Sequence, residues 1–479
     1  MVGYEINSKE SDGLGTTISN FARWDKPEVN NGVVYQSMGG SNSTTRIVSY
    51  ITRANYDYDN KYYLGASWRT DGSSRLAREN RWGNFWSLSG AWRVSSESFM
   101  KPLQNWLSDL KLRVSYGVNG TLPSSYYGYM GLSSLTSNYN DNPGITQSQL
   151  ENKELTWETN YNFNSGIDLG FFDNRLNVTF EYYVRTTKNL LYSRPLSLAT
   201  GFSSYLANIG KLQNKGYELE IRSTNIETKD FRWSTSLNLG HNANKILKLD
   251  GDLKQVTSGT SIHKVGLPYS TYYMIEFAGI DPADGEPMFY KNTTDENGNL
   301  NKETTKDPRS AEKVILQCAD PTITGGLGNS ISYKWFDLNF NVNFSFGAWN
   351  YDGSASKLEH GGDGTLNIPI YYRKRWQKEG DETSIERFVV GRSISMTDYA
   401  TTRRLYSGDY VRLKNLTFGF TLPKTWTRKV GIDNIRLYAS GNNLLTWAAY
   451  DYIDPESGSS PSWDTPPMRT YTFGLEVKF

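Results

Sequence analysis

The side chains best suited to chemistry are carboxylates and histidines, and their spacing argues against catalysis. Glu218 and Glu220 offer a general acid and a base. However, an i, i+2 pair on a strand lies on one polar face, where it serves equally well as a hydrated lining. The three histidines, His241, His263 and His360, lie far apart in the sequence. Such spacing does not match a compact metal-ligand motif.

Other motifs of reactive sites are equally weak. The single cysteine, Cys318, excludes an internal disulfide framework. The sequence has no Ser-His-Asp context and no phosphate-binding glycine motif after a strand. Residues 295–299 resemble the start of a calcium loop but lack the later acidic ligand, so we expect a plain hairpin turn. We therefore predict that the chain is not an enzyme and has no catalytic residue, metal site or cofactor.

Aromatic residues interleaved with Asp and Asn in two long connections are the candidates for ligand contact. Aromatic rings stack on apolar faces of a ligand, and amides or carboxylates hydrogen-bond its hydroxyls. The same residues could instead pack loop against loop or contact a partner protein. The candidate substrate or partner contacts are Trp349, Tyr351 and Asp352 in connection 348–408, and Trp447, Tyr450 and Trp463 in connection 447–469.

The composition narrows the class of protein that must position these side chains. Hydrophobic residues make up 37% of the 479 residues and aromatics 14%. No stretch approaches the roughly 20 apolar residues of a membrane helix, and the aromatic content excludes a disordered chain. Lys and Arg number 51 against 50 Asp and Glu, so no overall field favours nucleic acid. A large β protein rich in glycine and aromatics remains.

Period-two alternation dominates the chain and predicts strands. In residues 470–479, Tyr471, Phe473, Leu475 and Phe479 fall on one side and polar residues on the other. We count about thirteen such strands. They lie near 45–56, 61–70, 83–96, 109–119, 155–169, 175–187, 215–225, 231–243, 324–333, 336–347, 409–422, 434–446 and 470–479.

The lengths of these strands and of their connections predict a membrane barrel. Most strands run about 10–14 residues, which exceeds the globular average and suits a tilted strand that crosses a bilayer. Short connections alternate with longer ones, as in an up-and-down barrel. The short ones are 57–60, 97–108, 170–174, 226–230, 334–335 and 423–433, and the long ones are 71–82, 120–154, 188–214, 244–323, 348–408 and 447–469. We predict an all-β fold, an antiparallel transmembrane β-barrel.

A set of short segments, in order along most of the chain, resembles a known family. These segments are Arg69–Arg75, Arg81–Gly83, Ala91–Arg93, Leu110–Gly117, Leu155–Glu158, Asn208–Gly210, Asn214–Glu218, Gly279–Pro282, Tyr410–Leu416, Asn442–Thr446 and Asp454–Glu456. They resemble the C-terminal barrel portion of SusC/RagA-type TonB-dependent outer-membrane transporters of Bacteroidetes. The terminal Phe479 is similar to the C-terminal aromatic residue that outer-membrane barrels present to their assembly machinery.

The resemblance also implies a domain organisation. Residues 45–479 would form the C-terminal part of a barrel of roughly 22 strands, and residues 1–44 the end of an earlier strand or an extracellular loop. The plug, the N-terminal extension domain and the TonB box of a full member are not visible. Met1–Glu5 has no features of a signal peptide. An odd strand count also departs from the even number of single-chain bacterial barrels. We therefore expect a piece of a longer protein.

The function implied by the resemblance is active import of an oligosaccharide or peptide across the outer membrane of a Gram-negative cell. The implied partners are a SusD-like surface lipoprotein, TonB–ExbB–ExbD acting through the plug, outer-membrane lipid, and the barrel-assembly machinery through Phe479. A secreted β-rich carbohydrate-binding protein or enzyme is one alternative. It predicts shorter strands and a repeat of about 40–50 residues. A passive porin is the other alternative.

Overall fold

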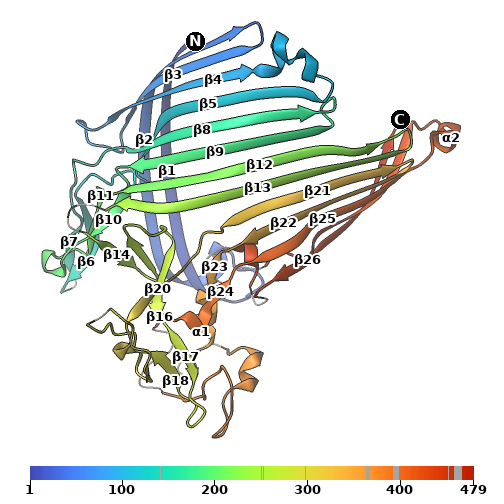
Figure 1. The fold of residues 1–479 in the computed structure, drawn as a ribbon. Coiled ribbons are helices and arrows are strands. Elements are labelled where there is room, and N and C mark those ends of the chain that lie inside the picture. Colours follow the sequence, from blue (N-terminus) through green and yellow to red (C-terminus); the bar gives the residue numbers. More distant parts are fainter. Residues whose placement is uncertain are drawn as a thin grey trace. The chain divides into compact units, whose positions relative to one another are not determined.

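A 14-stranded antiparallel sheet organises the protein. The computed structural model describes residues 1–140, 142–249, 251, 253–296, 298–362, 367–391, 399–450, 453–457 and 466–479. The strand order follows the chain (Figure 1). The strands are β1 (Val2–Phe21), β2 (Gly32–Tyr58), β3 (Tyr62–Ser73), β4 (Trp82–Arg93), β5 (Leu107–Thr121), β8 (Glu158–Phe171), β9 (Leu176–Lys188), β12 (Lys211–Glu227), β13 (Phe231–Lys248), β21 (Ile323–Tyr333), β22 (Phe336–Phe346), β25 (Tyr410–Thr421), β26 (Asn434–Ala448) and β27 (Thr470–Lys478). This confirms the all-β antiparallel prediction.

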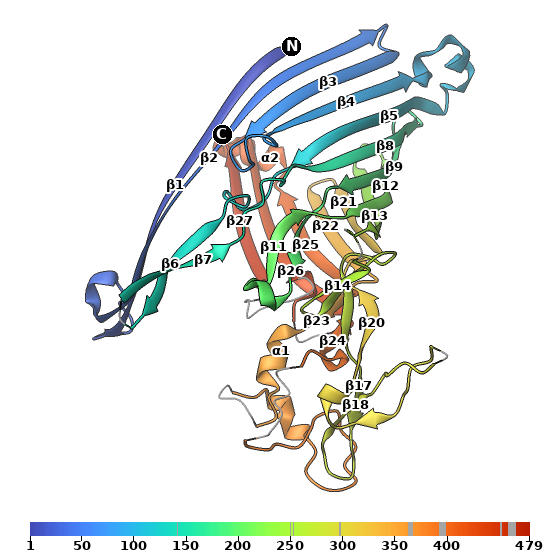
Figure 2. The same ribbon diagram turned by 90° about the vertical axis from the view of Figure 1, so that its left-hand side faces the viewer.

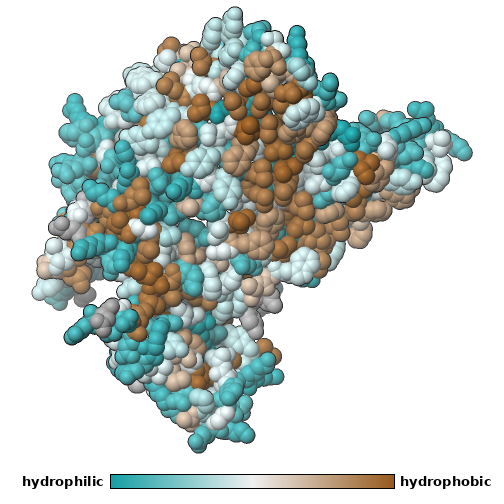
Figure 3. Space-filling view, in the orientation of Figure 1, coloured by the Kyte–Doolittle hydropathy of each residue, from teal (hydrophilic) through white to brown (hydrophobic). Residues whose placement is uncertain are grey.

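One face of this sheet is apolar and exposed, and we call it the outer face. On it, the Phe336 ring stacks with Phe418 and Phe420, at centroid distances of 5.8 and 4.9 Å. The opposite, inner face carries polar pairs such as Arg436 Nη2 with Asp337 Oδ2 at 2.7 Å. Brown apolar atoms gather over the strands in Figure 3, and teal polar atoms over the turns and loops. Successive strand side chains point to opposite faces, so period two in the sequence produces the two faces.

The first strand departs from the expectation for residues 1–44. This segment holds all of β1 and the beginning of β2, and the two strands pair from Val2–Thr52 to Phe21–Gly32. The sheet therefore has fourteen strands rather than the roughly thirteen counted from alternation. Most side chains of β1 are exposed. Backbone pairing, more than burial of an apolar row, holds this strand.

The connections mostly follow the expected alternation of short and long. Residues 59–61, 172–175, 228–230 and 334–335 are tight turns, several with positive-φ residues such as Asp59 and Lys334. Connections 94–106 and 422–433 are exceptions. Both were expected to be short, but both are longer than connection 74–81, and 94–106 holds the 3-10 helices Val94–Ser96 and Ser98–Leu103. Short helix α2 (Lys424–Thr427) and a 3-10 turn, Arg428–Val430, lie between β25 and β26.

The long connections contain smaller sheets and helices. Figure 2 shows β17, β18 and α1 together beyond the ends of β25 and β26. The additional elements are β6 (Leu132–Tyr139), β7 (Asn142–Gln149), β10 (Leu191–Pro195), β11 (Ser204–Asn208), β14 (Gln255–Ser258), β15 (Ser261–Lys264), β16 (Thr271–Ile275), β17 (Phe277–Ile280), β18 (Pro287–Tyr290), β19 (Thr304–Thr305), β20 (Lys313–Cys318), β23 (Trp349–Tyr351), α1 (Gly353–Leu358) and β24 (Leu405–Ser407), with 3-10 helices at Val29–Asn31, Leu198–Thr200, Pro308–Ser310, Ile370–Lys374, Thr402–Arg404 and Pro455–Ser457. The hairpin turn predicted at 295–299 is confirmed by the Thr294–Leu300 bridge, and a second hairpin pairs β17 with β18.

Two compact units divide the chain. The first comprises Met1–Trp92, Arg113–Asn164 and Arg185–Leu212, and the second comprises Arg93–Leu112, Ser165–Val184 and Gln213–Phe479. Among the described residues, no helix is both long and apolar enough to cross a bilayer.

Candidate functional site

The largest assembly of loops belongs to the second unit, and we call it the loop body: the described residues of 249–322 and 347–409. Its frame includes strand β23, which pairs Trp349 with Ser407 and Tyr351 with Leu405 of β24. Asp352 follows β23 and caps α1, because its Oδ1 accepts a hydrogen bond from the Ala355 amide at 2.8 Å. Two of the predicted contact residues, Tyr351 and Asp352, therefore form the junction between a strand and a helix.

Tyr450 reaches this junction from the connection after β26. Its hydroxyl donates to Asp352 Oδ2 at 3.2 Å, and its ring stacks on Tyr406 with centroids 3.6 Å apart. Burial raises the pKa of Tyr450, and the neighbouring Tyr406 and the Asp352 carboxylate raise it further. The hydroxyl therefore stays protonated and keeps donating over the physiological pH range.

The structure thus brings together four of the six predicted contact residues and separates one. Tyr351 and Asp352 are buried, so they hold one loop against another, whereas Trp349 and Tyr450 are partly exposed. Trp447 lies within β26 rather than in the following loop. It is 58% exposed and shares the outer face with Leu445. Trp463 lies outside the described residues.

A buried ion cluster lies next to Asp352, which sequence reasoning did not identify. Arg404 is only 1% exposed, and its Nε lies 3.1 Å from Glu359 Oε2. Its Nη2 also donates to the Glu359 backbone carbonyl at 3.1 Å. The second oxygen of Glu359 accepts a hydrogen bond from the Tyr371 hydroxyl at 2.6 Å. The Arg404 carbonyl in turn accepts from the Asp352 amide at 2.9 Å, which joins the cluster to the strand–helix junction.

The neighbouring Arg403 extends this cluster to a second carboxylate. Its guanidinium lies 3.5 Å from Glu359 and forms a close ion pair with Glu386, which is fully buried. The Tyr372 hydroxyl donates to Glu386 Oε1 at 2.9 Å. Burial opposes ionisation of Glu386, but the charge of Arg403 and these hydrogen bonds hold its pKa below the usual value.

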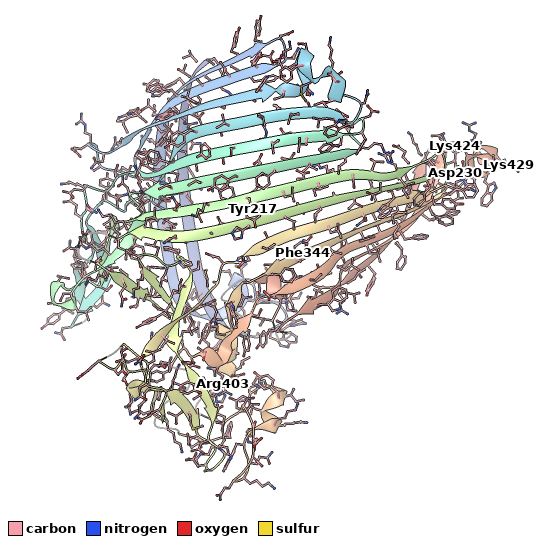
Figure 4. The ribbon with its side chains drawn as sticks, in the orientation of Figure 1. Tyr217, Asp230, Phe344, Arg403, Lys424 and Lys429 are labelled. Atoms are coloured by element: carbon pink, nitrogen blue, oxygen red, sulfur yellow. The ribbon has the colours of Figure 1, made fainter. Side chains whose placement is uncertain are left out.

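The six residues of this cluster come from four segments of one long connection, so only tertiary contact unites them: Glu359, Tyr371, Tyr372, Glu386, Arg403 and Arg404. In one of these segments, the 3-10 helix Ile370–Lys374 buries Tyr372. Figure 4 shows Arg403 among the loops, whereas Lys424 and Lys429 lie near the opposite ends of the strands. The cluster therefore lies at the long-loop end of this unit.

A second ion cluster ties the start of β25 to the loop after β26. Arg412 is 3% exposed, and its two terminal nitrogens contact Asp454 at 2.7 Å and Glu456 at 2.8 Å. Lys414 also contacts Glu456, at 2.6 Å. The segments Tyr410–Leu416 and Asp454–Glu456, quoted above for their resemblance, thus bind each other. Both segments matched the family resemblance in the sequence, but nothing in their residues indicated that the two segments contact each other.

Other resemblance segments meet in the first unit. The Thr156 amide donates to Asn208 Oδ1 at 2.8 Å, and Asn208 Nδ2 donates back to the Thr156 carbonyl at 2.9 Å. Next to this pair, the Trp157 indole donates to the Arg81 carbonyl at 3.0 Å. Trp157 also packs in a buried cluster with Leu76, Phe85, Val118 and Leu155. These segments therefore anchor the loops of this unit to its strands.

The inner face of the second unit is polar where the predicted acid–base pair lies. Glu218 and Glu220 line a hollow of about 700 Å³ together with Glu181, Asn238 and Asn343. Glu220 forms an ion pair with Arg222. The labels of Tyr217 and Phe344 in Figure 4 mark the neighbouring residues in β12 and β22, which alternate onto the outer face. The lining of this hollow is therefore polar and carries several charged side chains.

The histidines and the cysteine do not assemble into a reactive centre. Among the residues that the structure describes, no group of three His, Cys, Asp or Glu side chains could hold a metal ion. His263 stacks on Tyr269 at 4.2 Å, and burial lowers its pKa. Cys318 is a free thiol whose pKa is raised, mainly by burial.

Comparison with known proteins identifies the family. Residues 3–444 match the family described as TonB dependent receptor-like, beta-barrel. The chain is 33% identical to TonB-dependent receptor P3 of Formosa agariphila, over 100% of this chain and 50% of that protein. It is 30% identical to TonB-dependent receptor SusC of Bacteroides thetaiotaomicron, over 90% and 44% respectively. The structure of the RagAB peptide transporter matches with a TM-score of 0.85 and 29% identity, over 100% of this chain and 53% of that one.

The chain thus spans about half the length of these relatives. The match over 3–444, the ordered segments and the two-faced antiparallel sheet agree with one another. Proteins of this family are outer-membrane β-barrels of Bacteroidetes, and they are receptors and transporters. The chain belongs to the TonB-dependent receptor-like β-barrel family, within its SusC/RagA type.

Proposed function

We propose that this chain supplies barrel wall and extracellular loops to an active importer of oligosaccharides or peptides. The observation that carries the proposal is the family match over residues 3–444. RagAB, whose structure aligns with the whole chain, is a peptide transporter, which supports peptides as one substrate class. The polar inner face, with its glutamate-lined hollow, suits the wall of a hydrated passage.

In this proposal the loop body faces the cell exterior, because outer-membrane barrels place long loops outside and short turns in the periplasm. We assign substrate or partner contact to the loop surface around Trp349 and Tyr450, with Tyr351 and Asp352 beneath it. The partly exposed aromatic rings there are able to stack on a sugar or peptide. The two ion clusters would preserve the shape of that surface during repeated binding and release.

The proposed partners follow from the family. A SusD-like lipoprotein would cover the extracellular loops, and TonB–ExbB–ExbD would act through a plug and a TonB box. Phe479, which is 90% exposed after β27, would be read by the barrel-assembly machinery. Lipid would surround the outer face.

The experiment is growth of the source bacterium on single nutrients. A deletion strain, its complemented strain and a strain without TonB are compared on a panel of oligosaccharides and oligopeptides. We expect the deletion strain and the TonB-deficient strain to lose growth on the same nutrient, and complementation to restore it.

Three outcomes would contradict the proposal. Growth that needs the gene but not TonB would indicate a passive porin. Growth of the deletion strain on every nutrient of the panel would contradict import of both classes. The tagged protein is also purified from outer membranes in mild detergent by affinity chromatography. If no lipoprotein is purified with it, the proposed SusD-like partner is contradicted.

A further inference from the structure

The outer face of the first unit contains an apolar groove across β2, β3, β4 and β5. Its volume is about 600 Å³, and its lining is predominantly apolar. The side chains that line it on the outer face are Ala54, Tyr56, Leu64, Ala66, Leu88, Val114 and Tyr116, with the backbone of Gly90. If large side chains occupied all of these positions, they would fill the space and no such hollow would form.

Strand register explains why the groove exists. Ala54 pairs with Ala66, and Ala66 with Leu88, so two small side chains lie side by side in β2 and β3, next to Leu88 of β4. In the next row Leu64 pairs with Gly90. A Cβ atom added at Gly90 would meet no atom closer than 3.8 Å, which shows open space above this position.

Aromatic rings flank this hollow at both of its ends along the strands. On the side of the turn at 59–61, Tyr62 stacks with Trp92 at 6.4 Å and lies 6.5 Å from Tyr58. On the other side, Trp86 and Tyr116 lie 5.8 Å apart. Aromatic residues next to a strand end are typical of the boundary between lipid and water. The groove therefore begins just inside that boundary.

The position in the strands assigns the groove to one leaflet. Leu64 and Ala66 lie three and five residues beyond Lys61 of the tight turn, which is about 10–17 Å along the strand. Tight turns of outer-membrane barrels lie in the periplasm. The groove thus opens to the periplasmic leaflet, which consists of phospholipid.

We infer that this groove binds one acyl chain of a periplasmic-leaflet phospholipid. The groove is part of the outer face, which family membership places against hydrocarbon. Its lining offers almost no hydrogen-bonding group on that face, so a peptide backbone would lose its hydrogen bonds there. A second copy of the flat sheet would leave the hollow unfilled, whereas a flexible hydrocarbon chain is able to fill it.

Filling the groove tests this inference. The full-length protein, purified from outer membranes in mild detergent, is compared with its Gly90→Leu and Ala66→Leu variants by native mass spectrometry. Each variant places an isobutyl group in the hollow from a different strand. We expect the wild type to retain a phospholipid that both variants lose by roughly tenfold, as displacement of about two buried methylenes would give.

The matched control is Ala439→Leu, on the outer face of β26 between Phe418 and Phe473. It adds the same group outside the groove and should retain phospholipid like the wild type. A mobility shift between boiled and unboiled samples checks that each variant is folded. The inference would be overturned if the groove variants retained as much phospholipid as the wild type, or if the control lost as much as the groove variants. It would also be overturned if the wild type retained lipid A instead of phospholipid, or if it formed a dimer that both groove variants dissociate.

Discussion

Buried charge dominates the loop body at the scale of single residues. Arg404 and Glu386 are almost fully buried, and each is paired with an opposite charge and further hydrogen bonds. A buried pair adds little net stability relative to an apolar pair, but removal of one partner leaves an uncompensated charge. Substitutions here should therefore be far more damaging than the replacement of exposed ions.

Arg404→Met should destabilise the loop body by about 3 kcal/mol. This is the low end for a broken buried pair, because Arg403 remains 3.5 Å from Glu359. Hydrogen exchange over 353–362 and 399–407 measures the loss of protection. Arg387→Met, in an ion pair with Glu286 that is partly exposed, is the control and should change little. Equal protection in both variants would contradict a structural role for the buried cluster.

The loop body should lose protection in acid through Glu386. The pKa of this carboxyl lies below its ordinary value of 4.5 in the folded state. The charge therefore contributes stability that is fully present above pH 4.5 and is lost as the pH falls through the lower folded pKa. Hydrogen exchange or limited proteolysis between pH 7 and pH 3 tests this. Glu386→Gln should be less protected at pH 7 and should respond less to acid; an unchanged acid response would contradict the assignment.

At the scale of elements, ion pairs fasten loops to strand ends. Arg412 in β25 holds Asp454 and Glu456 of the connection that leads to β27. The Thr156–Asn208 pair does the same in the first unit. In both cases a polar residue at the end of a strand binds a loop that is distant in sequence.

Arg412→Met should release the segment Asp454–Ser457. We expect a cost of about 3 kcal/mol, because both carboxylates lose a partner that is almost fully buried. Hydrogen exchange over 453–457 reports the release. Lys414→Met removes only a partly exposed contact with Glu456 and should cost about 0–1 kcal/mol. If the two variants showed the same exchange over 453–457, the attachment of this segment to β25 would not depend on Arg412.

The two faces of β22 should respond in opposite ways to a new charge. Phe340 alternates onto the outer face and Asn341 onto the inner face. Phe340→Arg should destabilise the barrel by about 2–4 kcal/mol, since arginine would face hydrocarbon. Asn341→Arg should be tolerated. The amount of folded protein in outer membranes, read from unboiled gels, checks this; a more harmful Asn341→Arg would reverse the assignment of the faces.

At the scale of the whole molecule, the ordered strand sequence is that of an outer-membrane barrel of the family. Barrel folds resist detergent until heated. The full-length protein from outer membranes should therefore migrate differently in boiled and unboiled samples. Identical migration, with the protein recovered in the aqueous phase after detergent partitioning, would contradict the membrane assignment.

Strand positions were largely predictable, and the reason is local. In β22 and β27 the alternation of apolar and polar residues is nearly complete, because both faces meet different solvents. β1 was not predictable, because after Tyr4 and Ile6 the strand carries mainly polar and small residues. Its structure depends on pairing with β2, and backbone pairing does not require alternating apolar and polar residues in β1 itself.

The candidate contact residues show the same limit. Residue type marked Trp349, Tyr351, Asp352 and Tyr450 as candidates in two separate connections, and the structure places the four together. Residue type did not reveal that Tyr351 and Asp352 are buried, or that Trp447 belongs to the outer face. Burial of a loop residue depends on which other loop covers it, and that information is spread over distant segments.

The amino-acid sequence by itself determined the fold class, the two faces of the sheet and the family, because alternation and short ordered motifs are properties of neighbouring residues. Only the tertiary structure decided that Arg403 and Arg404 meet Glu359 and Glu386, and that Ala54, Ala66 and Gly90 open a groove. These arrangements require the register of paired strands and contact between distant loops. Long-range contacts of this kind carry no signal in local periodicity.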